Sequence, residues 1–481
     1  MERSAMLLTL IAVFIALVEG LAILMAIHAV MHVRSSQGAV AWVIALITFP
    51  WLTLPLYWVF GRNRFKGYVE ALSQGYQEKM QEVRDQNAAL EAFRAFAPED
   101  RDDALRVFES LAGTPFTLGN TPQLLINGKV TFEAIFKAIS EARDYVLLEF
   151  FIVRDDSLGR RLQRLLMEKA RSGVRVYFLY DEIGCRGLKK GYGARLMDAG
   201  VLFCPFFTRR GLFNRFQLNF RNHRKIVVVD GEKAFVGGHN VGREYLGKSR
   251  KFGCWRDTHM AVEGPAVLAV QRVFEGDWYW ATRTPLALNW ELRPQGERKG
   301  AAVLVLPTDP ACNPEACSLF FVNAILSAKK RVWIASPYFI PNDAVMQALQ
   351  MAALRGVDVR ILLPLRSDVR LVHLAGYVYL PRLAMEGIRI FRYLPGFLHQ
   401  KVILVDDRFA AVGTANADNR SFHLNFEITL VTADAAFAAR VLHMLERDFA
   451  VSREVDGRAL PKPEWFFRVV VRFAGLFSPV L

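Results

Sequence analysis

Residues 222–240 read NHRKIVVVDGEKAFVGGHN, and residues 398–416 read LHQKVILVDDRFAAVGTAN. Each stretch has a histidine and a lysine two positions apart, an apolar run, an aspartate, a turn, glycine and a final asparagine. The β-branched runs IVVV and VILV predict buried strands. Asp230-Gly231 predicts a tight turn that returns AFVGG as the partner strand, and Asp407-Arg408 takes the same place in the second copy.

Side chains two positions apart share one face of a strand, so we expect His223 and Lys225 to project together, as do His399 and Lys401. A lone histidine is ordinarily a core residue, but the same spacing twice makes that interpretation poor. The sequence therefore predicts one site built from both stretches, which requires that the two halves pack face to face.

The residues around each pair favour a phosphodiester as the ligand. Lysine is a compact charge suited to phosphate, and Asn240 and Asn416 can donate hydrogen bonds to it. Of two histidines near neutral pH, a neutral one can attack phosphorus while a protonated one supplies the leaving group's proton. Asp230 and Asp406 lie at strand ends, so we expect them to hold the hairpin and the lysine rather than react.

The chain around these stretches is duplicated. Helix, strand, helix and strand follow one another in both halves, with the matching junctions SGVRV and RGVDV. This alternation predicts an α/β fold of mostly parallel strands covered by helices. We expect a first half over residues 113–295 and a second over residues 296–452.

Two long apolar runs precede the duplication. Met6–Ile27 and Gly38–Phe60 are each long enough to cross a bilayer, which takes about 20 residues, and residues 1–66 are predicted to form two transmembrane helices. The basic cluster of Arg62, Arg64 and Lys66 predicts that the remaining chain is cytoplasmic. Glu19 is costly in a membrane, and it has a functional role, lies against the second helix, or extends its carboxylate to the membrane surface.

The flanking segments have their own patterns. Residues 67–112 predict amphipathic helices that link membrane and catalytic part, and residues 453–481 predict either a membrane-docking tail or a helix packed on the core. The 481 residues carry a net charge of +14, which suits anionic lipid or nucleic acid. The five cysteines show no metal-binding spacing and require no disulfide.

The repeated pattern is similar to the HxKxxxxD motif of the phospholipase D superfamily, with the Gly-x-x-Asn segments GGHN and GTAN behind it. More narrowly, FPWLTLPLYWVFGRNRFKGY, FGCWRDTHMAVEGPAV and GTANADNRSFHLNFE resemble the bacterial cardiolipin synthases over essentially the whole chain. The second copy departs slightly, with Thr414 where many members have serine. The resemblance implies two phospholipase D-like α-β-α sandwich halves packed face to face, behind two transmembrane helices.

The resemblance also implies the reaction: two phosphatidylglycerol molecules condense to cardiolipin and glycerol, without metal or cofactor, at the bacterial inner membrane. It implies catalytic roles for both His-Lys-Asp sets, with His223 as the nucleophile that forms a phosphatidyl-histidine. Asp257 follows His223 by 34 residues and Glu427 follows His399 by 28, and such acids orient a histidine ring in the family. Arg420, beside the second motif, is expected to bind the other headgroup.

Other interpretations of the sequence stay open. The same site would suit phospholipid hydrolysis, transfer to another alcohol or from phosphatidylethanolamine, or a nuclease, although the membrane runs argue against nucleic acid as the partner. A non-catalytic lipid scaffold would be expected to lack part of a motif. The segment Arg209–Asn222 either guides headgroups, stacks bases or simply packs, and His239, His259 and His423 are expected to be structural or to support the site. The sequence does not give the oligomeric state.

Overall fold

The computed structural model describes residues 2–61, 68–69, 80–97, 102–206, 219–249, 251–291, 300–311, 315–455 and 465–481. The chain divides into two compact units. The N-terminal unit consists of Met1–Val69 with Thr208–Phe220, and the main unit consists of Glu70–Phe207 with Arg221–Leu481.

The N-terminal unit contains helices α1 (Glu2–His32), α2 (Ser36–Thr48) and α3 (Pro50–Phe60). In the part of the chain that the structure describes, α1 alone is long and apolar enough to cross a membrane. The second apolar run is divided at Phe49, because Pro50 lacks an N–H and disfavours helical backbone in the residue before it. The prediction of a second continuous helix over Gly38–Phe60 is therefore wrong.

Helices α2 and α3 pack back against the second part of α1. Small residues of α1 (Ala22, Ala26 and Ala29) are buried against Leu46 and Tyr57. The Nδ1 atom of His28 lies 2.8 Å from the Tyr57 hydroxyl. Most other apolar side chains of α1 are exposed, as is Glu19, so this helix presents its hydrophobic surface outward. Arg62, Arg64 and Lys66 lie outside the described residues.

The main unit alternates strands and helices in each half. The segment before the first half contains α5 (Met80–Glu91) and α6 (Asp103–Ala112). The first half has β1 (Thr117–Ile126), α7 (Asn127–Glu141), β2 (Tyr145–Phe150), α8 (Ser157–Arg171), β3 (Arg175–Tyr180), α9 (Lys190–Asp198), β4 (Leu202–Pro205), β5 (Arg221–Asn222), β6 (Ile226–Val229), β7 (Lys233–Gly237), β8 (Cys254–Arg256), β9 (Thr258–Glu263) and α10 (Ala266–Thr282).

The second half begins with β10 (Ala301–Thr308), α11 (Ala316–Ser327), β11 (Arg331–Ala335), β12 (Phe339–Ile340), α12 (Asp343–Leu354), β13 (Asp358–Pro364), α13 (Arg370–Gly376) and α14 (Leu380–Met385). It continues with β14 (Arg389–Tyr393), β15 (Gly396–Leu398), β16 (Val402–Val405), β17 (Phe409–Gly413), β18 (Ala417–Asp418), α15 (Asn419–His423), β19 (Asn425–Ala433), α16 (Ala435–Ala450), β20 (Ser452–Glu454) and α17 (Trp465–Gly475). Short 3₁₀ turns at Arg243–Leu246 and Ser478–Val480 complete the set.

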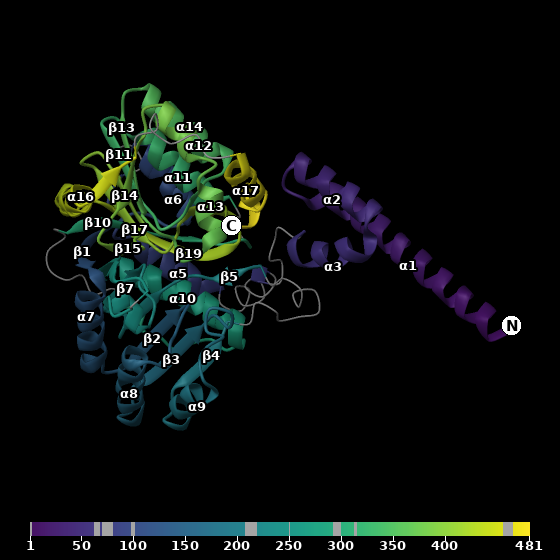
Figure 1. The fold of residues 1–481 in the computed structure, drawn as a ribbon. Helices are drawn as coiled ribbons and strands as arrows, with labels where there is room; N and C mark the ends of the chain where they lie inside the picture. The colour runs from purple at the N-terminus through teal and green to yellow at the C-terminus, as the bar shows by residue number, and fades with distance from the viewer. Residues whose placement is uncertain are drawn as a thin grey trace. The chain divides into compact units, whose positions relative to one another are not determined.

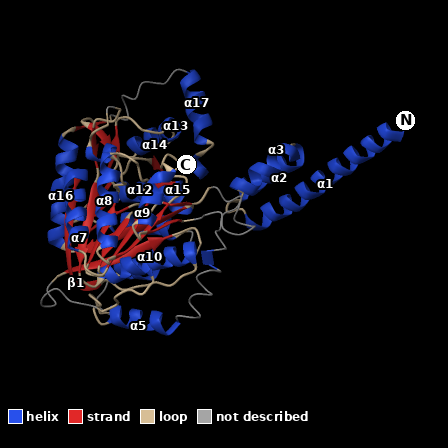
Figure 2. Cartoon of the chain, turned by 90° about the horizontal axis from the view of Figure 1, so that it is seen from below, coloured by secondary structure: helices blue, strands red, loops and turns tan. Residues whose placement is uncertain are grey.

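The strands form one extended mixed sheet with the order β20-β14-β13-β11-β16-β17-β19-β10-β1-β9-β7-β6-β2-β3-β4. Strands β2, β3 and β4 pair in parallel, as do β11, β13 and β14. The strands that carry the repeated motifs are antiparallel to these. The other neighbouring pairs along this sheet are antiparallel, so the prediction of mostly parallel strands is wrong. The tight hairpins of the motif strands can only connect antiparallel neighbours. Helices lie on both faces of the sheet (Figures 1 and 2).

Both predicted hairpins are present. Strand β6 pairs with β7, where Val229 faces Lys233, and β16 pairs with β17, where Val405 faces Phe409. The two halves join through the antiparallel pair β1 and β10, whose register shifts near Asn120. Strand β7 also contacts β17 and β19, and β9 contacts β17.

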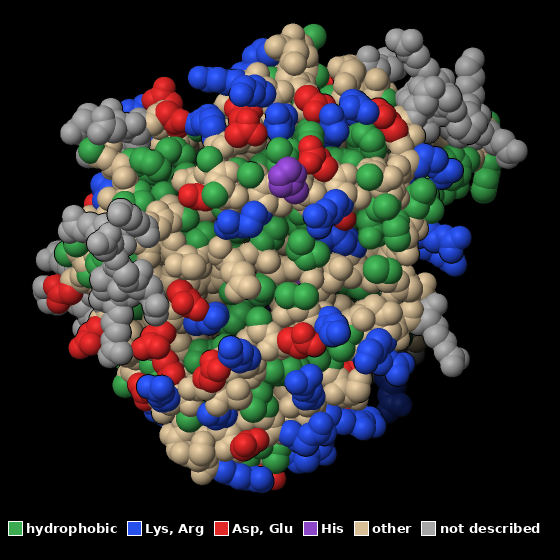
Figure 3. All heavy atoms as spheres, turned by 90° about the vertical axis from the view of Figure 1, so that its left-hand side faces the viewer, with side chains coloured by type: hydrophobic (Ala, Val, Ile, Leu, Met, Phe, Trp, Pro, Cys, Tyr) green, Lys and Arg blue, Asp and Glu red, His purple; other side chains and the backbone are tan. Residues whose placement is uncertain are grey.

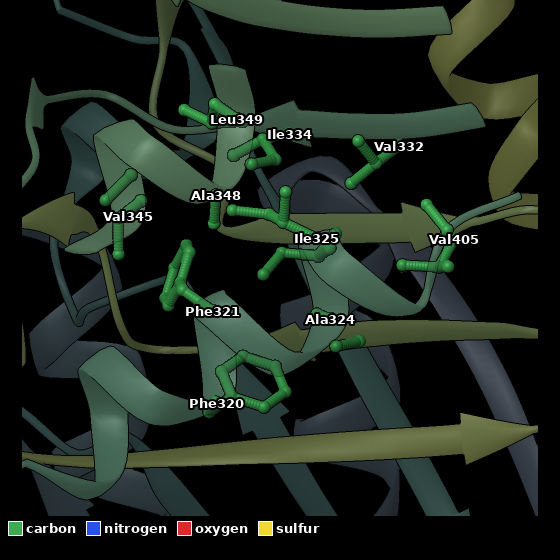
Figure 4. Packing of buried hydrophobic residues seen from close by; sticks show 14 of the residues in the cluster. Phe320, Phe321, Ala324, Ile325, Val332, Ile334, Val345, Ala348, Leu349 and Val405 are labelled. Carbon is green, nitrogen blue, oxygen red and sulfur yellow. The ribbon is translucent and has the colours of Figure 1, made fainter. Parts of the chain in front are cut away.

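Each half has its own buried core. In the second half, Phe320 and Phe321 of α11 pack toward Ile334 of β11 and Val345 of α12 (Figure 4). Phe108 of α6, in the segment that the sequence assigns to a linker, is fully buried in this same core. A separate cluster in the first half fills the space between α7, α8 and the strands β2, β3 and β6. Two rigid cores can therefore hold the motif strands from both sides.

The described cysteines (Cys185, Cys204, Cys254 and Cys317) are free thiols, and Cys312 lies outside the described residues.

Candidate active site

Each motif is carried across to the other half by one short strand pair. Strand β5, just before His223, pairs in parallel with the start of β19, so that Asn222 faces Phe426. Strand β15, just before His399, pairs in parallel with β8, so that Leu398 faces Arg256. The next residue along each partner strand is an acid. The chain therefore places each histidine beside a carboxylate from the opposite half.

The two carboxylates are exchanged between the halves. The Nδ1 atom of His223 lies 2.9 Å from both oxygens of Glu427, 204 residues away. The Nδ1 atom of His399 lies 2.8 Å from Oδ2 of Asp257, 142 residues away. Sequence spacing places each acid behind the histidine of its own half, and the structure instead pairs it with the other histidine. Both histidines keep some exposure, at 8% and 7%.

Both acids are fully buried and fixed by further donors. Oε1 of Glu427 accepts from the Ser421 hydroxyl at 2.9 Å and from Nδ2 of Asn425 at 3.0 Å. Oδ1 of Asp257 accepts from the backbone N–H of Thr258 at 2.8 Å. Carboxylates held in this way fix the orientation of the histidine rings.

The ammonium group of each lysine contacts the backbone carbonyl of the histidine two residues before it. Nζ of Lys225 donates to the His223 carbonyl at 2.5 Å, and Nζ of Lys401 donates to the His399 carbonyl at 2.6 Å. Nζ of Lys401 also lies 3.0 Å and 3.1 Å from the two ring nitrogens of His399. The four residues come directly before strands β6 and β16, rather than within them.

Burial and mutual repulsion shape the charges of this cluster. Burial, opposed by Glu427, lowers the pKa of His223 to about 4. Burial also lowers the pKa of Lys225 to about 7 and that of Lys401 to about 8. The pKa of His399 is lowered by burial and by the charge of Lys401. For His223, Lys225 and His399 the charge of a neighbouring lysine adds to this lowering, whereas for Lys401 burial acts against the nearby carboxylates.

The acids remain ionised. Burial by itself would raise the pKa of Glu427, but His223 and Lys225 bring it below its ordinary value. Burial likewise opposes ionisation of Asp257, and His239, His399 and Lys401 more than offset it. At neutral pH each histidine is therefore neutral, with its Nδ1 proton donated to a carboxylate. This leaves the Nε2 lone pair of His223 available, whereas Nε2 of His399 faces Nζ of Lys401 at 3.1 Å.

The residue between histidine and lysine anchors each motif, which sequence reasoning missed. Nη1 of Arg224 lies 2.6 Å from Asp277 on α10, and Nε2 of Gln400 donates to Asp448 on α16 at 2.9 Å. Asp448 also accepts hydrogen bonds from Nε and Nη2 of Arg256, at 2.7 Å and 2.8 Å. The available signal was a polar residue between histidine and lysine, directly before a buried strand, because a buried polar group requires a partner.

The motif aspartates lie at the far ends of their strands. The Asp230 carboxylate accepts from three backbone N–H groups at the start of β2, at 2.8–2.9 Å. The Asp406 carboxylate accepts from three at the start of β11, at 2.7–3.2 Å. These contacts bind the hairpin to the neighbouring strand. Among the described residues, Lys225 and Lys401 donate to the carbonyls of His223 and His399 rather than to either aspartate, so the expected hold on the lysine is not seen.

The three residues expected to bind phosphate differ in their hydrogen-bond partners. Asn240 is buried, with Oδ1 accepting from the Ile152 backbone at 3.0 Å and Nδ2 donating to the Tyr245 hydroxyl at 3.0 Å. Oδ1 of Asn416 is buried without a hydrogen-bond partner in the described part of the chain. Nη1 of Arg420 donates to the Val480 carbonyl at 3.2 Å.

The remaining histidines have structural surroundings. Nδ1 of His239 and Nδ1 of His259 lie 3.2 Å apart in the core, and His423 lies 3.7 Å from Glu315. Among the described residues no group of three or more His, Cys, Asp or Glu is placed to hold a metal ion. Residues 209–218 of the predicted Arg209–Asn222 segment lie outside the described residues.

Charged surface residues give no sign of a nucleic-acid groove on the face that Figure 3 displays. Lys and Arg side chains are interspersed there with Asp and Glu over much of the surface. A continuous basic stripe would be expected along a nucleic-acid backbone.

Comparison with known proteins supplies relatives along the whole chain. Residues 321–449 match the family model "Cardiolipin synthase, PLD-like domain", and residues 20–62 match "Phospholipase_D-nuclease N-terminal". Cardiolipin synthase A of Pseudomonas putida is 48% identical over 471 residues, covering 97% of both chains. Cardiolipin synthase A of Pseudomonas aeruginosa is 50% identical over 468 residues, covering 96% of this chain and 95% of its own.

One solved structure shares the fold. Phosphatidylserine synthase of Haemophilus influenzae superposes with a TM-score of 0.60 at 17% identity, covering 79% of this chain and 100% of its own.

Proposed function

The chain belongs to the cardiolipin synthase family of phospholipase D-like phosphatidyltransferases, and we propose that it joins two phosphatidylglycerol molecules to give cardiolipin and glycerol. The observation that carries this proposal is the exchange of acids, because it makes one site from both motifs. A double displacement at phosphorus needs a nucleophile and a separate proton donor, and the two histidines supply both.

The first step forms the phosphatidyl-enzyme. Nε2 of His223 attacks the phosphorus of the first phosphatidylglycerol, while the Nδ1–H of the same ring donates a hydrogen bond to Glu427. The bond between phosphorus and the glycerol headgroup oxygen breaks, and protonated His399 gives its Nε2 proton to that oxygen. The positive charges of Lys225 and Lys401 counter the negative charge of the phosphate. Glycerol leaves, and His399 is left neutral.

The second step returns the enzyme to its starting state. Neutral His399 removes the proton from a headgroup hydroxyl of the second phosphatidylglycerol, and this oxygen attacks phosphorus. The bond between phosphorus and Nε2 of His223 breaks as cardiolipin forms. His399 is protonated again for the next cycle.

The electrostatics favour this division of labour. Without a ligand, two lysines and two histidines crowd one buried space, and both histidine pKa values lie below the ordinary value. An anionic phosphodiester opposes that repulsion, so its arrival raises the pKa of His399 toward the protonated form that the first step needs. His223 stays neutral while its Nε2 is directed at phosphorus.

The membrane supplies both substrates. Helix α1 and the family match at residues 20–62 support attachment to the bacterial inner membrane. We propose a multi-pass arrangement with the main unit in the cytoplasm, in which α2 and α3 together replace the single second span. We further propose that the two halves face one another around the cluster of His223, Lys225, His399 and Lys401.

The products decide between this reaction and its alternatives. The purified full chain in phosphatidylglycerol vesicles is expected to release one glycerol for each cardiolipin formed, as measured by mass spectrometry. His223→Ala and His399→Ala should each abolish both products without unfolding the chain. Phosphatidic acid as the main product would show a hydrolase, and salt-sensitive cleavage of nucleic acid would favour a nuclease.

A further inference from the structure

The 3₁₀ turn after α17 contacts the short helix α15, which follows the second motif. The backbone N–H of Arg420 donates to the Leu481 carbonyl at 2.9 Å, and its Nη1 donates to the Val480 carbonyl at 3.2 Å. Nδ2 of Asn419 donates to the Ser478 carbonyl at 3.1 Å. Three carbonyls of Ser478–Leu481 therefore hold two consecutive residues of α15.

Helix α15 is connected directly to the site. The Ser421 hydroxyl donates to Oε1 of Glu427 at 2.9 Å and also accepts from the Asn416 backbone N–H at 3.0 Å. Glu427 in turn holds Nδ1 of His223. A displacement of α15 would thus move the donor that fixes the His223 carboxylate and the backbone of Asn416 together.

Helix α17 carries this contact on an amphipathic scaffold. Val471 and Ala474 are buried, and Ala474 shares a small buried cluster with Ala375 of α13. Helices α13 and α17 lie side by side (Figure 1). On another face, large apolar side chains recur at helical spacing and are exposed: Trp465 (75%), Phe466 (70%), Val469 (45%), Phe473 (62%) and Leu476 (73%). Arg468 and Arg472 are exposed beside this stripe.

An anionic bilayer surface suits this face. Aromatic and aliphatic side chains enter the interface between headgroups and acyl chains, while flanking arginines contact anionic headgroups. Phosphatidylglycerol supplies that negative charge. It is the substrate in the proposed function, on which this inference rests.

We propose that residues 465–481 form a lipid-docking brace: α17 enters the bilayer surface, and Ser478–Leu481 hold α15 so that Ser421 positions the Glu427–His223 pair. Residues of the brace are positioning residues, because none of them contacts the reacting histidines. Docking of α17 would thereby hold the site in its working geometry where its substrate lies.

Two kinds of variant separate docking from positioning. The docking variant combines Phe466→Glu with Phe473→Glu, and its matched control is Leu354→Glu, an equally drastic change at the 79% exposed end of α12. The positioning variants are deletion of residues 478–481 and Asn419→Leu. The second breaks one contact without shortening the chain, which keeps the test valid if the deletion fails to fold.

Each variant of the full chain is assayed for cardiolipin on phosphatidylglycerol in proteoliposomes and on short-chain phosphatidylglycerol in detergent. The docking variant should lose roughly 10-fold in the ratio of vesicle rate to detergent rate, because buried apolar side chains supply most of such binding. Leu354→Glu should leave the ratio unchanged. Asn419→Leu should lower kcat roughly 5-fold on both substrates at constant KM, as expected for one lost hydrogen bond that positions the site.

Contrary results are clear. An unchanged ratio in the docking variant overturns docking to lipid, and a change in oligomer mass by light scattering in its place would assign the stripe to a second copy. A wild-type kcat in both positioning variants overturns the brace. The wild type in the same assay tests the proposed function independently, because it must form cardiolipin whatever the variants do.

Discussion

Asp257→Asn should damage His399 through its tautomer rather than through lost packing. In the native site Oδ1 of Asp257 accepts from the Thr258 backbone N–H at 2.8 Å, and Oδ2 accepts from Nδ1 of His399 at 2.8 Å. A backbone N–H can only donate, so the asparagine must keep its oxygen there. Its NH₂ group then faces His399, which has to accept at Nδ1 and carry its proton on Nε2.

His399 in that tautomer has no lone pair at Nε2 and cannot take the proton of the second substrate's hydroxyl. By analogy with other histidine–aspartate pairs, kcat should fall roughly 10³- to 10⁴-fold, or about 4–5 kcal/mol in the barrier. KM should change little, because Asp257 is fully buried and the lysines that bear the phosphate charge are intact.

Glu427→Gln should be milder, and this difference comes from one neighbour. Nδ2 of Asn425 donates to Oε1 of Glu427, while Oδ1 of Asn425 is buried without a partner in the described part of the chain. Rotation of the Asn425 amide lets its oxygen accept from the new NH₂ group, so that glutamine can keep its oxygen toward His223. We expect a loss of roughly 10- to 100-fold in kcat.

The assay is steady-state cardiolipin formation from phosphatidylglycerol by each full-length variant in proteoliposomes, with thermal unfolding in detergent as the control for folding. Adding Asn425→Ala to Glu427→Gln removes the rotating amide and should lower the activity further. Wild-type activity of Asp257→Asn would refute the reasoning, and so would a loss in Glu427→Gln larger than that in Asp257→Asn.

Three further outcomes follow from charge and backbone contacts. Lys225 and Lys401, with pKa values of about 7 and 8, lose their charge as pH rises, so tungstate affinity should fall roughly 10-fold between pH 6.5 and 8.5; calorimetry that finds constant affinity would contradict this. Asp406→Ala leaves three backbone N–H groups at β11 without their acceptor and should cost about 3–5 kcal/mol, visible as a lower Tm, whereas the exposed neighbour Asp407→Ala should leave Tm nearly unchanged. Burial lowers the pKa of His239 to about 4, so the unfolded chain binds more protons below pH 6.5 and stability falls toward pH 4, by roughly 3 kcal/mol at pH 4.5 from this group; His239→Gln should reduce the Tm difference between pH 7 and 4.5, and an unaltered difference would exclude this cause.

Local patterns in the sequence predicted the hairpins and the pairing of histidine with lysine. The run IVVV, the turn at Asp230-Gly231 and the spacing of His223 and Lys225 depend only on neighbours in the chain. The duplication likewise predicted two halves of similar order. Each of these features reflects short-range physics, because strand propensity and turn chemistry act over a few residues.

The exchange of acids could not be predicted in the same way. His223 and Glu427 are 204 residues apart, and only the cross-half pairing of β5 with β19 brings them together. Spacing within one half assigns Glu427 to His399 instead. The break at Pro50 was a different kind of error: hydropathy gave the length of the apolar run, but the missing N–H of proline decided that it forms two helices.

For Arg420 the sequence predicted the position beside the site but not the hydrogen-bond partner. The motif places it beside the second site, and the structure does so too, but its guanidinium donates to the carbonyl of Val480. Nothing in the sequence around Arg420 indicates that residues some sixty positions later would return to this helix. A headgroup role for Arg420 remains a prediction.

The covalent intermediate tests the composite site most directly. The full chain in vesicles of phosphatidylglycerol labelled at phosphorus is quenched at high pH within a turnover, digested and mapped by mass spectrometry. Label on the peptide that contains His223, absent from His223→Ala and chased into cardiolipin by unlabelled lipid, is the expected result. Label on His399, or turnover without any labelled histidine, would contradict the assignment of His223 as nucleophile and His399 as its proton donor.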